Sequence, residues 1–274
     1  MIGTGQFLAA GGVFWLLGSH AWDQVTIGTA RQQAAEHYQQ AAAFFRARQA
    51  EKAIAELRRS LQLDPQQARA EKLLGLSCQL INRNYDAESA FLRACSLAPR
   101  DPEAWFFLGR LYYLQNFFDK ARQALETALS YDSRDFRIHE TLALALEAEG
   151  NLEGALEEYR QAVRWNTGTQ ASSASPHLNF GILLYKLDQL RESEEQLRRA
   201  RELGPKDWQA CFELGKLYLR QEKLEAAARE LEAALKLGTA DAGRVYYLLA
   251  QVYARMGRED DARSAFAMSK KNQK

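Results

Sequence analysis

The chain has 274 residues, of which 36 are Lys or Arg and 35 are Asp or Glu, so its formal net charge is +1. This balance argues against a protein dominated by nucleic-acid or anionic-membrane binding, which would carry a basic excess. A hydrophobic fraction of 47% with 26% charged residues excludes wholesale disorder, and three cysteines cannot form a disulfide framework.

The first 33 residues form a leader that is rich in glycine and carries no charged side chain before Asp23. An apolar run over residues 7–18 is followed by a small-x-small sequence, which is typical of a secretory signal peptide and here predicts cleavage after Ala21. Residues 1–6, however, lack the Lys or Arg of such a signal, and the run is shorter than the roughly 20 residues of a spanning helix. Two interpretations stay open: residues 1–21 are a signal or anchor, or the leader is a partly apolar N-terminal extension.

After the leader, the prolines indicate a repeat. Pro65 and Pro99 lie 34 residues apart, and each ends a similar phrase, Leu-Gln-Leu-Asp-Pro and Cys-Ser-Leu-Ala-Pro. Counting in 34s from Ala34 gives four repeats over 34–169, then an insertion at 170–173, and three further repeats over 174–274. The repeats begin at residues 34, 68, 102, 136, 174, 208 and 243, and positions are numbered from 1 within each of them.

Several positions hold the same kind of side chain in every repeat. Positions 20 and 27 are always Ala or Ser, position 8 is always Gly or Ala, and positions 11 and 24 are bulky or apolar. Apolar spacings of 3, 4 and 7 in each half predict two amphipathic helices per repeat. Position 15 holds a turn-tolerant residue in five repeats, which ends the first helix. Proline at position 32 ends the second helix of the first, second and fifth repeats, whereas three other repeats hold Ser133, Thr167 or Thr239 there. The turn residues are Asn82, Asn116, Gly150, Asp188 and Gly257.

These positions resemble the tetratricopeptide repeat family, whose pattern is W-x₂-L-G-x₂-Y, A-x₃-F and A-x₄-P. The third repeat is most similar, with Trp105 to Tyr112, then Ala121 and Ala128. The resemblance covers residues 34–274 and implies an all-α fold, an α-solenoid of antiparallel helix pairs that forms a right-handed superhelix. No repeat can bury its apolar face alone, so stacked neighbours make the core.

The insertion between the fourth and fifth repeats predicts a longer surface loop over 168–175. Ser175 is predicted to cap the next helix, with Pro176 as the first helical residue. The loop is either an inert elongation or a hinge that separates four repeats from three.

The residues with catalytic or ligand chemistry are assigned to packing. His37, His139 and His177 all occupy position 4, where the resemblance implies a large residue packed between helices, and no HExxH or Ser/His/Asp set is present. The cysteines are interpreted as small apolar core residues, with a disulfide between Cys78 and Cys95 conceivable only in an exported protein. The sequence therefore predicts no catalytic residue, no metal ligand and no cofactor.

The resemblance implies that the first helices line a concave groove, into which positions 2, 5, 9 and 12 point. Aromatic rings alternate there with Arg and Lys, which suits an extended peptide. The alternative is that these aromatic rings pack on neighbouring helices. The candidate groove residues are Tyr38, Phe45, Arg69, Lys72, Phe106, Arg110, Tyr113, Arg137, Tyr185, Phe212, Lys216, Arg244 and Tyr247.

One specialised use of such grooves is a five-residue clamp for the carboxylate of chaperone tails. Lys72 and Arg137 match that clamp, whereas Leu76, Phe107 and Thr141 do not. The groove is therefore expected to have only a mild preference for acidic segments.

The sequence thus predicts a non-catalytic protein–protein interaction scaffold that binds an extended peptide or a partner helix. The alternative is a recruitment or assembly subunit of a larger enzyme, secretion or envelope complex, and an intrinsic enzyme comes third. The expected partner is a protein or peptide, not nucleic acid, with membrane contact only through an N-terminal anchor. If the leader is a signal, the protein is periplasmic, secreted or membrane-anchored; otherwise it is cytoplasmic.

Overall fold

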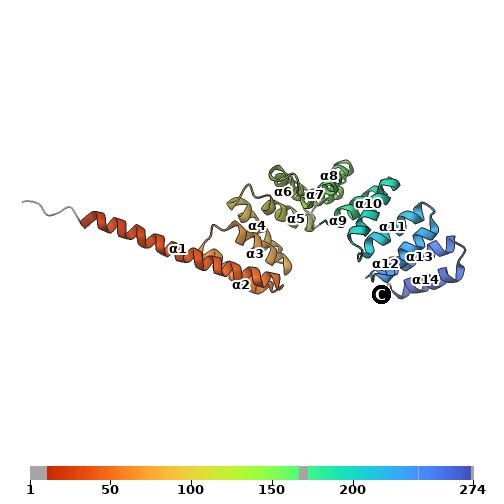
Figure 1. The fold of residues 1–274 in the computed structure, drawn as a ribbon, viewed down its shortest axis with the longest axis horizontal. Helices are drawn as coiled ribbons and strands as arrows, with labels where there is room; N and C mark the ends of the chain where they lie inside the picture. Colours follow the sequence, from red (N-terminus) through yellow and green to blue (C-terminus); the bar gives the residue numbers. More distant parts are fainter. Residues whose placement is uncertain (1–10, 167–171, 240, 273–274) are drawn as a thin grey trace, which may run out of the picture. The chain divides into compact units, whose positions relative to one another are not determined.

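The computed structural model describes residues 11–166, 172–239 and 241–272, with no description of the side chains of residues 11–27. This part of the chain consists of fourteen helices without a strand, and consecutive helices pack in pairs (Figure 1). The pairs follow the seven predicted repeats, which confirms the all-α solenoid of helix pairs. The helices are α1 (Gly11–Arg46), α2 (Ala50–Leu63), α3 (Ala68–Leu80), α4 (Asn84–Leu97), α5 (Pro102–Leu114), α6 (Phe118–Tyr131), α7 (Phe136–Glu149), α8 (Leu152–Trp165), α9 (Ser175–Lys186), α10 (Leu190–Leu203), α11 (Trp208–Arg220), α12 (Leu224–Lys236), α13 (Ala242–Arg255) and α14 (Glu259–Lys271).

The leader and the first repeat share one helix. Helix α1 begins at Gly11 and continues past Ala34 to Arg46, so the repeat has no helix start of its own. Residues 1–10, part of the predicted signal or anchor, lie outside the described residues. Among the helices as described, none is long and apolar enough to cross a membrane.

The turn inside each repeat has one geometry throughout. Position 15 has a positive φ in all seven repeats, as predicted at five of them; Arg48 and Glu222 are the other two. The amide at position 16 donates to the carbonyl at position 11 at 2.9 Å, for example from Arg83 to Cys78 and from Lys223 to Tyr218. This bond spans five residues and closes a Schellman motif, which satisfies carbonyls that the helix end would leave unpaired.

The recurring small residues are where the helices come closest. Position 20 is fully buried in six repeats, and position 27 is at most 1% exposed in all seven. Position 8 lies against position 24 of the same repeat: a Cβ at Gly75 would lie 2.4 Å from the Phe91 ring, and one at Gly215 would lie 2.6 Å from Cγ of Leu231. The bulky side chain at position 24 therefore fills the space that glycine leaves.

Side-chain N-caps begin the first helix of some repeats, but not of the fifth repeat. The carboxylates of Asp101, Asp135 and Asp207 accept the amide two residues on, as N-caps do. The prediction for Ser175 is wrong by one residue: α9 begins at Ser175, Ala174 takes the cap position without a side-chain bond, and Pro176 follows inside the first turn. The Ser175 hydroxyl instead donates to Glu140 on α7.

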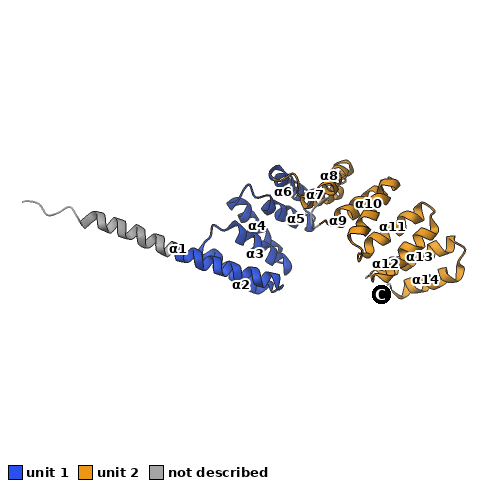
Figure 2. Ribbon diagram, in the orientation of Figure 1, with its two compact units in different colours: residues 1–131 blue, residues 132–274 orange. Residues whose placement is uncertain are grey.

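The chain divides into two compact units, residues 1–131 and 132–274, called here the N-terminal and C-terminal units (Figure 2). The division falls between the third and fourth repeats, and the hinge at the insertion stays a prediction. Residues 167–171 of that insertion lie outside the described residues. The C-terminal end of the insertion, Ser173, is held by the buried side chain of Asn166. Nδ2 of Asn166 donates to the Ser173 carbonyl at 2.7 Å, and Oδ1 of Asn166 accepts a hydrogen bond from the Ser173 backbone amide at 2.9 Å.

Candidate functional site

Every predicted groove residue lies on the first helix of its repeat, and at several junctions within a unit position 5 of one repeat meets position 2 of the next. The Arg69 guanidinium lies 5.0 Å from the centre of the Tyr38 ring, and that of Arg244 lies 5.3 Å from the Phe212 ring. Lys72 Nζ lies 2.7 Å from a carboxylate oxygen of Glu103. The predicted alternation of rings and charges is therefore a set of contacts between successive helices.

In the C-terminal unit these contacts join into a cation–aromatic row, defined as Tyr185, Phe212, Lys216, Arg220 and Arg244. Lys216 Nζ lies 5.2 Å from the Tyr185 ring and 5.6 Å from the Phe212 ring. The Arg220 guanidinium lies 5.1 Å from the centre of the same Tyr185 ring and donates a hydrogen bond to the Tyr185 carbonyl. Each such contact contributes about 0.5–1 kcal/mol at exposed sites. The two rings thus lie beside all three cations of the row.

Burial differs within the row. Phe212 is only 4% exposed, so its ring supports its neighbours and offers little surface, whereas Arg220 and Arg244 are exposed. Each of the three cations pairs with a carboxylate: Lys216 with Glu213 at 2.6 Å, Arg220 with Asp188 at 3.0 Å and Arg244 with Asp241 at 2.9 Å. The row therefore presents exposed guanidinium groups on an aromatic base, and each cation already has a carboxylate partner.

At the equivalent positions of the N-terminal unit, the side chains are occupied by partners within that unit. Lys72 lies 2.7 Å from both Asp101 and Glu103. Burial alone would lower the pKa of Lys72, but its bonds to Asp101 and Glu103 outweigh burial and raise the pKa. Phe106 is 4% exposed, and Arg110 lies 5.7 Å from its ring. Lys72 thus acts mainly as a brace between α3 and α5.

The remaining predicted residues occupy edges of the two units. Tyr113 is half-buried, with its ring 6.0 Å from that of Phe118, and Phe45 is half-buried on α1. Arg137 is exposed and pairs with Asp135 at 2.6 Å. Tyr247 is 45% exposed at the far end of the C-terminal unit. The structure thus joins Tyr185, Phe212, Lys216 and Arg244 into one row, while Arg137 and Tyr247 stand apart from it.

The sequence analysis missed Arg220 on this face and the hydrogen-bond partners of Glu140. Arg220 is at position 13, which was not assigned to the groove, although Lys186, Arg220 and Arg255 make position 13 basic in three successive repeats. Glu140 on α7 accepts hydrogen bonds from Ser175 and Asn179 on α9, and burial raises its pKa. The basic run at position 13 was a readable signal, whereas the partners of Glu140 lie 35 and 39 residues away.

The three histidines at position 4 share one kind of contact. Nδ1 of His37 lies 2.6 Å from Glu56, Nδ1 of His139 lies 2.7 Å from Glu158, and Nδ1 of His177 lies 2.8 Å from Gln196. Every partner occupies position 23. Where position 4 holds Trp105 or Tyr246, position 23 is Ala instead, so the sequence signal for this pair was His at position 4 together with a polar residue at 23. The histidines pack between helices, as predicted, with a hydrogen bond in addition.

The partner at position 23 sets the charge state of the imidazole. Burial alone would lower the pKa of His139, but its bonds to Glu158 and to the Ser133 carbonyl outweigh burial, and the pKa is raised. Burial lowers the pKa of His177, because the neutral amide of Gln196 compensates only in part. These are structural pairs with opposite responses to protonation.

The cysteines are buried and free, so the Cys78–Cys95 disulfide considered above is absent. Burial raises the pKa of Cys95 to about 12 and that of Cys211 to about 11, which suppresses thiolate chemistry near neutral pH. Within the described ranges, no group of three or more His, Cys, Asp or Glu side chains is placed to hold a metal ion.

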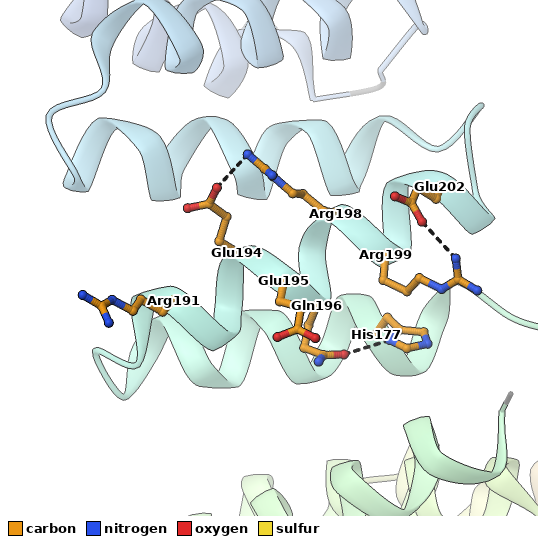
Figure 3. A pocket seen from close by; sticks show the side chains of 8 residues that line it. All are labelled: His177, Arg191, Glu194, Glu195, Gln196, Arg198, Arg199 and Glu202. Atoms are coloured by element: carbon orange, nitrogen blue, oxygen red, sulfur yellow. Dashed lines mark hydrogen bonds and ion pairs between the residues drawn. The ribbon is translucent and has the colours of Figure 1, made fainter.

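A surface cavity of about 620 Å³ lies along α10, away from the row (Figure 3). Figure 3 shows His177 directed at Gln196, Arg198 at Glu194, and Arg199 at Glu202. The lining is thus dominated by ion pairs along one helix and lacks convergent groups. None of the predicted groove residues lines it.

The stacked helix pairs and their 34-residue period define a helical-repeat scaffold. A model of the tetratricopeptide repeat matches residues 108–175, 178–230 and 212–273, and the chain belongs to this family of protein-interaction scaffolds. The first two repeats lie before the matched stretches and are identified by their structure.

Two curated relatives share 25% of aligned residues. BBSome complex member BBS4 of Bos taurus aligns over 178 residues, 64% of this chain and 33% of its own length. The TPR repeat-containing protein YpiA of Bacillus subtilis (strain 168) aligns over 188 residues, 68% of this chain and 43% of its own length. The chain therefore spans less than half of either relative.

Solved structures support the same fold. Pseudomonas aeruginosa pilF is similar with a TM-score of 0.69 and 19% identity, over 83% of this chain and 99% of that one. YrrB, described as a TPR protein with an unusual peptide-binding site, is similar with a TM-score of 0.58 and 20% identity, over 68% of this chain and 94% of that one. At such identities the likeness concerns the fold alone.

Proposed function

We propose that the first-helix face of the chain binds an extended segment or a helix of a partner protein. The observation that carries the proposal is the cation–aromatic row on α9, α11 and α13, where rings hold exposed guanidinium groups in place. Aromatic and Arg side chains are the usual anchors of protein interfaces. Carboxylates in the bound segment would complement the row, which is consistent with the peptide-binding site named for YrrB.

Affinity purification with mass spectrometry tests this proposal in cells that produce the protein. A chain with Arg220→Glu and Arg244→Glu should recover the main partner at least tenfold less than the natural chain does. The matched control carries Arg191→Glu and Arg199→Glu, two exposed α10 residues outside the row. A partner that is lost from the control and kept by the row variant would contradict the proposal.

We further propose that the chain has no catalysis of its own and takes no nucleic acid. The absence of catalysis is supported by the histidine contacts, because His139 and His177 bond to Glu158 and Gln196 of their own repeats. Turnover by the purified chain that disappears on His139→Ala or His177→Ala would overturn the first statement. Salt-sensitive binding to duplex DNA near physiological salt would overturn the second.

An alternative proposal is that the chain is a recruitment or assembly subunit of a larger complex. It is favoured by the similarity to BBS4, which is named as a member of such a complex. Size fractionation of a gentle lysate distinguishes the alternatives: an assembly subunit co-elutes stably with a large complex, whereas a peptide-binding scaffold elutes mainly near its own mass.

For location, we propose that residues 1–21 direct the protein to export or to a membrane, and that the chain without them stays in the cytoplasm. The support is the apolar run before Ala21. Fractionation of cells that make the full chain or a chain starting at Val25, together with the mass of the N-terminal peptide, tests this. The same compartment for both chains would exclude a targeting role.

A further inference from the structure

A surface cavity of about 260 Å³, called here the junction cavity, lies where the first repeat meets the second. Glu71 on α3 is only 3% exposed, whereas Pro65, Arg93 and Ser96 around it are exposed. The Glu71 carboxylate therefore forms the inner end of a cavity that opens to solvent. The lining comes from α2, α3, α4 and the loop before α3, namely Leu61, Pro65, Glu71, Arg93, Ser96 and Leu97.

The Glu71 carboxylate is incompletely paired. Among the residues that the structure describes, Oε2 of Glu71 has no hydrogen-bond partner. Oε1 lies 3.6 Å from a nitrogen of Arg93, which is beyond ordinary hydrogen-bond distance, and the Arg93 side chain is 71% exposed. Burial raises the pKa of Glu71, because Arg93 compensates for burial only in part. A buried carboxylate oxygen without a donor is costly, so Glu71 would gain from a donor that enters the cavity.

Glu71 occupies position 4, where other repeats place a flat ring that carries nitrogen. Nε1 of Trp105 donates to the Pro99 carbonyl at 2.9 Å, and Nε2 of His139 lies 3.1 Å from the Ser133 carbonyl. Pro99 and Ser133 both occupy position 32 of the preceding repeat. The junction between two repeats thus accepts a flat ring whose nitrogen meets the carbonyl at position 32.

The second repeat lacks such a ring but keeps the room for one. Its position 23 is Ala90, just as position 23 of the third repeat is Ala124. Pro65, which lines the junction cavity, is at position 32 and corresponds to Pro99. The cavity therefore lies at the place where the third repeat holds an indole, and the carboxylate of Glu71 is an additional acceptor there.

The fourth repeat shows what two such acceptors hold. Nδ1 of His139 lies 2.7 Å from the Glu158 carboxylate, while Nε2 faces the carbonyl at position 32. One flat group with two nitrogen atoms thus bridges a carboxylate and a backbone carbonyl. At the junction cavity, Glu71 and Pro65 supply the same two kinds of acceptor, with Leu61 and Leu97 as apolar walls.

We propose that the junction cavity binds a planar nitrogen cation, an amidinium, guanidinium or imidazolium group that donates to the Glu71 carboxylate and to the Pro65 carbonyl. The positive charge compensates the buried carboxylate, which a neutral ring would not do. The cation is a side chain of a bound protein or part of a free small molecule, and the experiment distinguishes these sources. The site is separate from the cation–aromatic row and does not depend on the groove proposal.

Isothermal titration calorimetry with benzamidine as the probe tests the proposal on the full chain near pH 7. Benzamidine is a planar cation, whereas benzamide has the same shape without the charge, and benzylamine carries its charge on a tetrahedral ammonium group. We expect saturable binding of benzamidine that is about tenfold tighter than that of either comparison compound. Glu71→Gln should weaken it about tenfold. The matched control Glu126→Gln, at an exposed carboxylate on α6, should leave it unchanged.

A second variant keeps the test decisive if Glu71→Gln perturbs folding. Glu71→Trp next to Ala90 recreates the arrangement of the third repeat and fills the cavity with a ring of the chain itself. It should abolish benzamidine binding while the unfolding temperature stays the same or rises. The variant Arg220→Glu with Arg244→Glu should retain benzamidine binding, which separates this site from the groove proposal.

Three results would overturn the assignment: benzamidine binding that is not saturable, equal binding to the Glu71→Gln or Glu71→Trp chain, or equally tight binding of benzamide or benzylamine. For the source, a side chain of a bound protein predicts that Glu71→Trp reduces recovery of that protein and that benzamidine displaces it. A free small molecule predicts that mass spectrometry finds a planar cation in the natively purified chain and none in the Glu71→Trp chain. If Glu71→Trp changes neither, the cavity holds no such ligand in cells and the proposal fails.

Discussion

At the scale of the residue, the histidine pairs show how one substitution at position 23 changes the chemistry of position 4. His139 faces a carboxylate and His177 an amide, at nearly the same distance and depth. The raised pKa of His139 makes its contribution to stability largest below about pH 6.5, and that contribution is lost as pH rises through the folded-state pKa. The lowered pKa of His177 has the opposite effect: stability falls as pH falls below about 6.5.

Exchanging the two partners should exchange the two behaviours. Glu158→Gln is expected to lower the pKa of His139, because the imidazolium loses its anion, and Gln196→Glu is expected to raise the pKa of His177. Titration of the imidazole signals by NMR measures both. If neither pKa moves, position 23 does not govern the charge of position 4.

The left-handed residues at position 15 allow a second prediction. Gly257 has φ of 72° with open space around it, so Gly257→Ala should destabilise the chain by about 1 kcal/mol through backbone strain alone. Arg48 has φ of 57° and is exposed, so Arg48→Gly should stabilise it by about 0.5 kcal/mol. Urea denaturation measures both, and shifts of equal sign would contradict the strain argument.

At the scale of the element, the contact between positions 8 and 24 decides how closely the two helices of a pair approach. Gly75 faces the fully buried ring of Phe91, whereas the first and fourth repeats have Ala41 and Ala143 at this position. The facing side chain at position 24 therefore decides how much room a methyl group at position 8 has.

We expect Gly75→Ala to destabilise the chain by about 1–3 kcal/mol, because the Phe91 ring cannot withdraw from a fully buried site. Gly28→Ala in the exposed part of α1 is the control, since nothing lies within 4 Å and helix propensity alone should make it neutral or stabilising. Thermal unfolding followed by circular dichroism compares them. Equal effects of the two substitutions would show that packing at position 8 is loose.

The helix pairs could be predicted from the sequence because each depends on residues that recur within one repeat. The turns at Asn82 and Gly150 could be predicted, because these residue types tolerate left-handed backbone. The turns at Arg48 and Glu222 could not, because only the surrounding helix ends force these residue types into that conformation. The predicted site could be placed on the first helices for the same reason. The burial of Phe106 and Phe212, by contrast, depends on neighbours in three dimensions, and so do the partners of Ser175.

At the scale of the whole molecule, the chain consists of two compact units, each held together by contacts between neighbouring helices. The C-terminal unit has its own buried cluster around Leu214, Leu217 and Leu231. In a repeat protein, stability is close to a sum over repeats and their interfaces, so a unit with a complete cluster needs no distant part of the chain.

Residues 132–274 alone should therefore fold into a helical, cooperatively unfolding protein. Circular dichroism and a thermal melt of this fragment test the expectation. The fragment should also keep the cation–aromatic row and bind the partner of the full chain. A fragment that is unfolded at 25 °C would show that the division into two compact units is not a division of stability.

The contacts between position 5 of one repeat and position 2 of the next have a consequence for the order of the repeats. Tyr38 meets Arg69, Lys72 meets Glu103, and Phe212 meets Arg244, so at these three junctions a repeat is matched to the particular repeat that follows. A shuffled chain that placed the seventh repeat after the second would set Lys72 against Arg244, two like charges at a close junction. The repeats share one geometry, yet the contacts at these junctions mean that the repeats cannot be exchanged freely. The amino-acid sequence therefore specifies the order of the repeats as well as their fold.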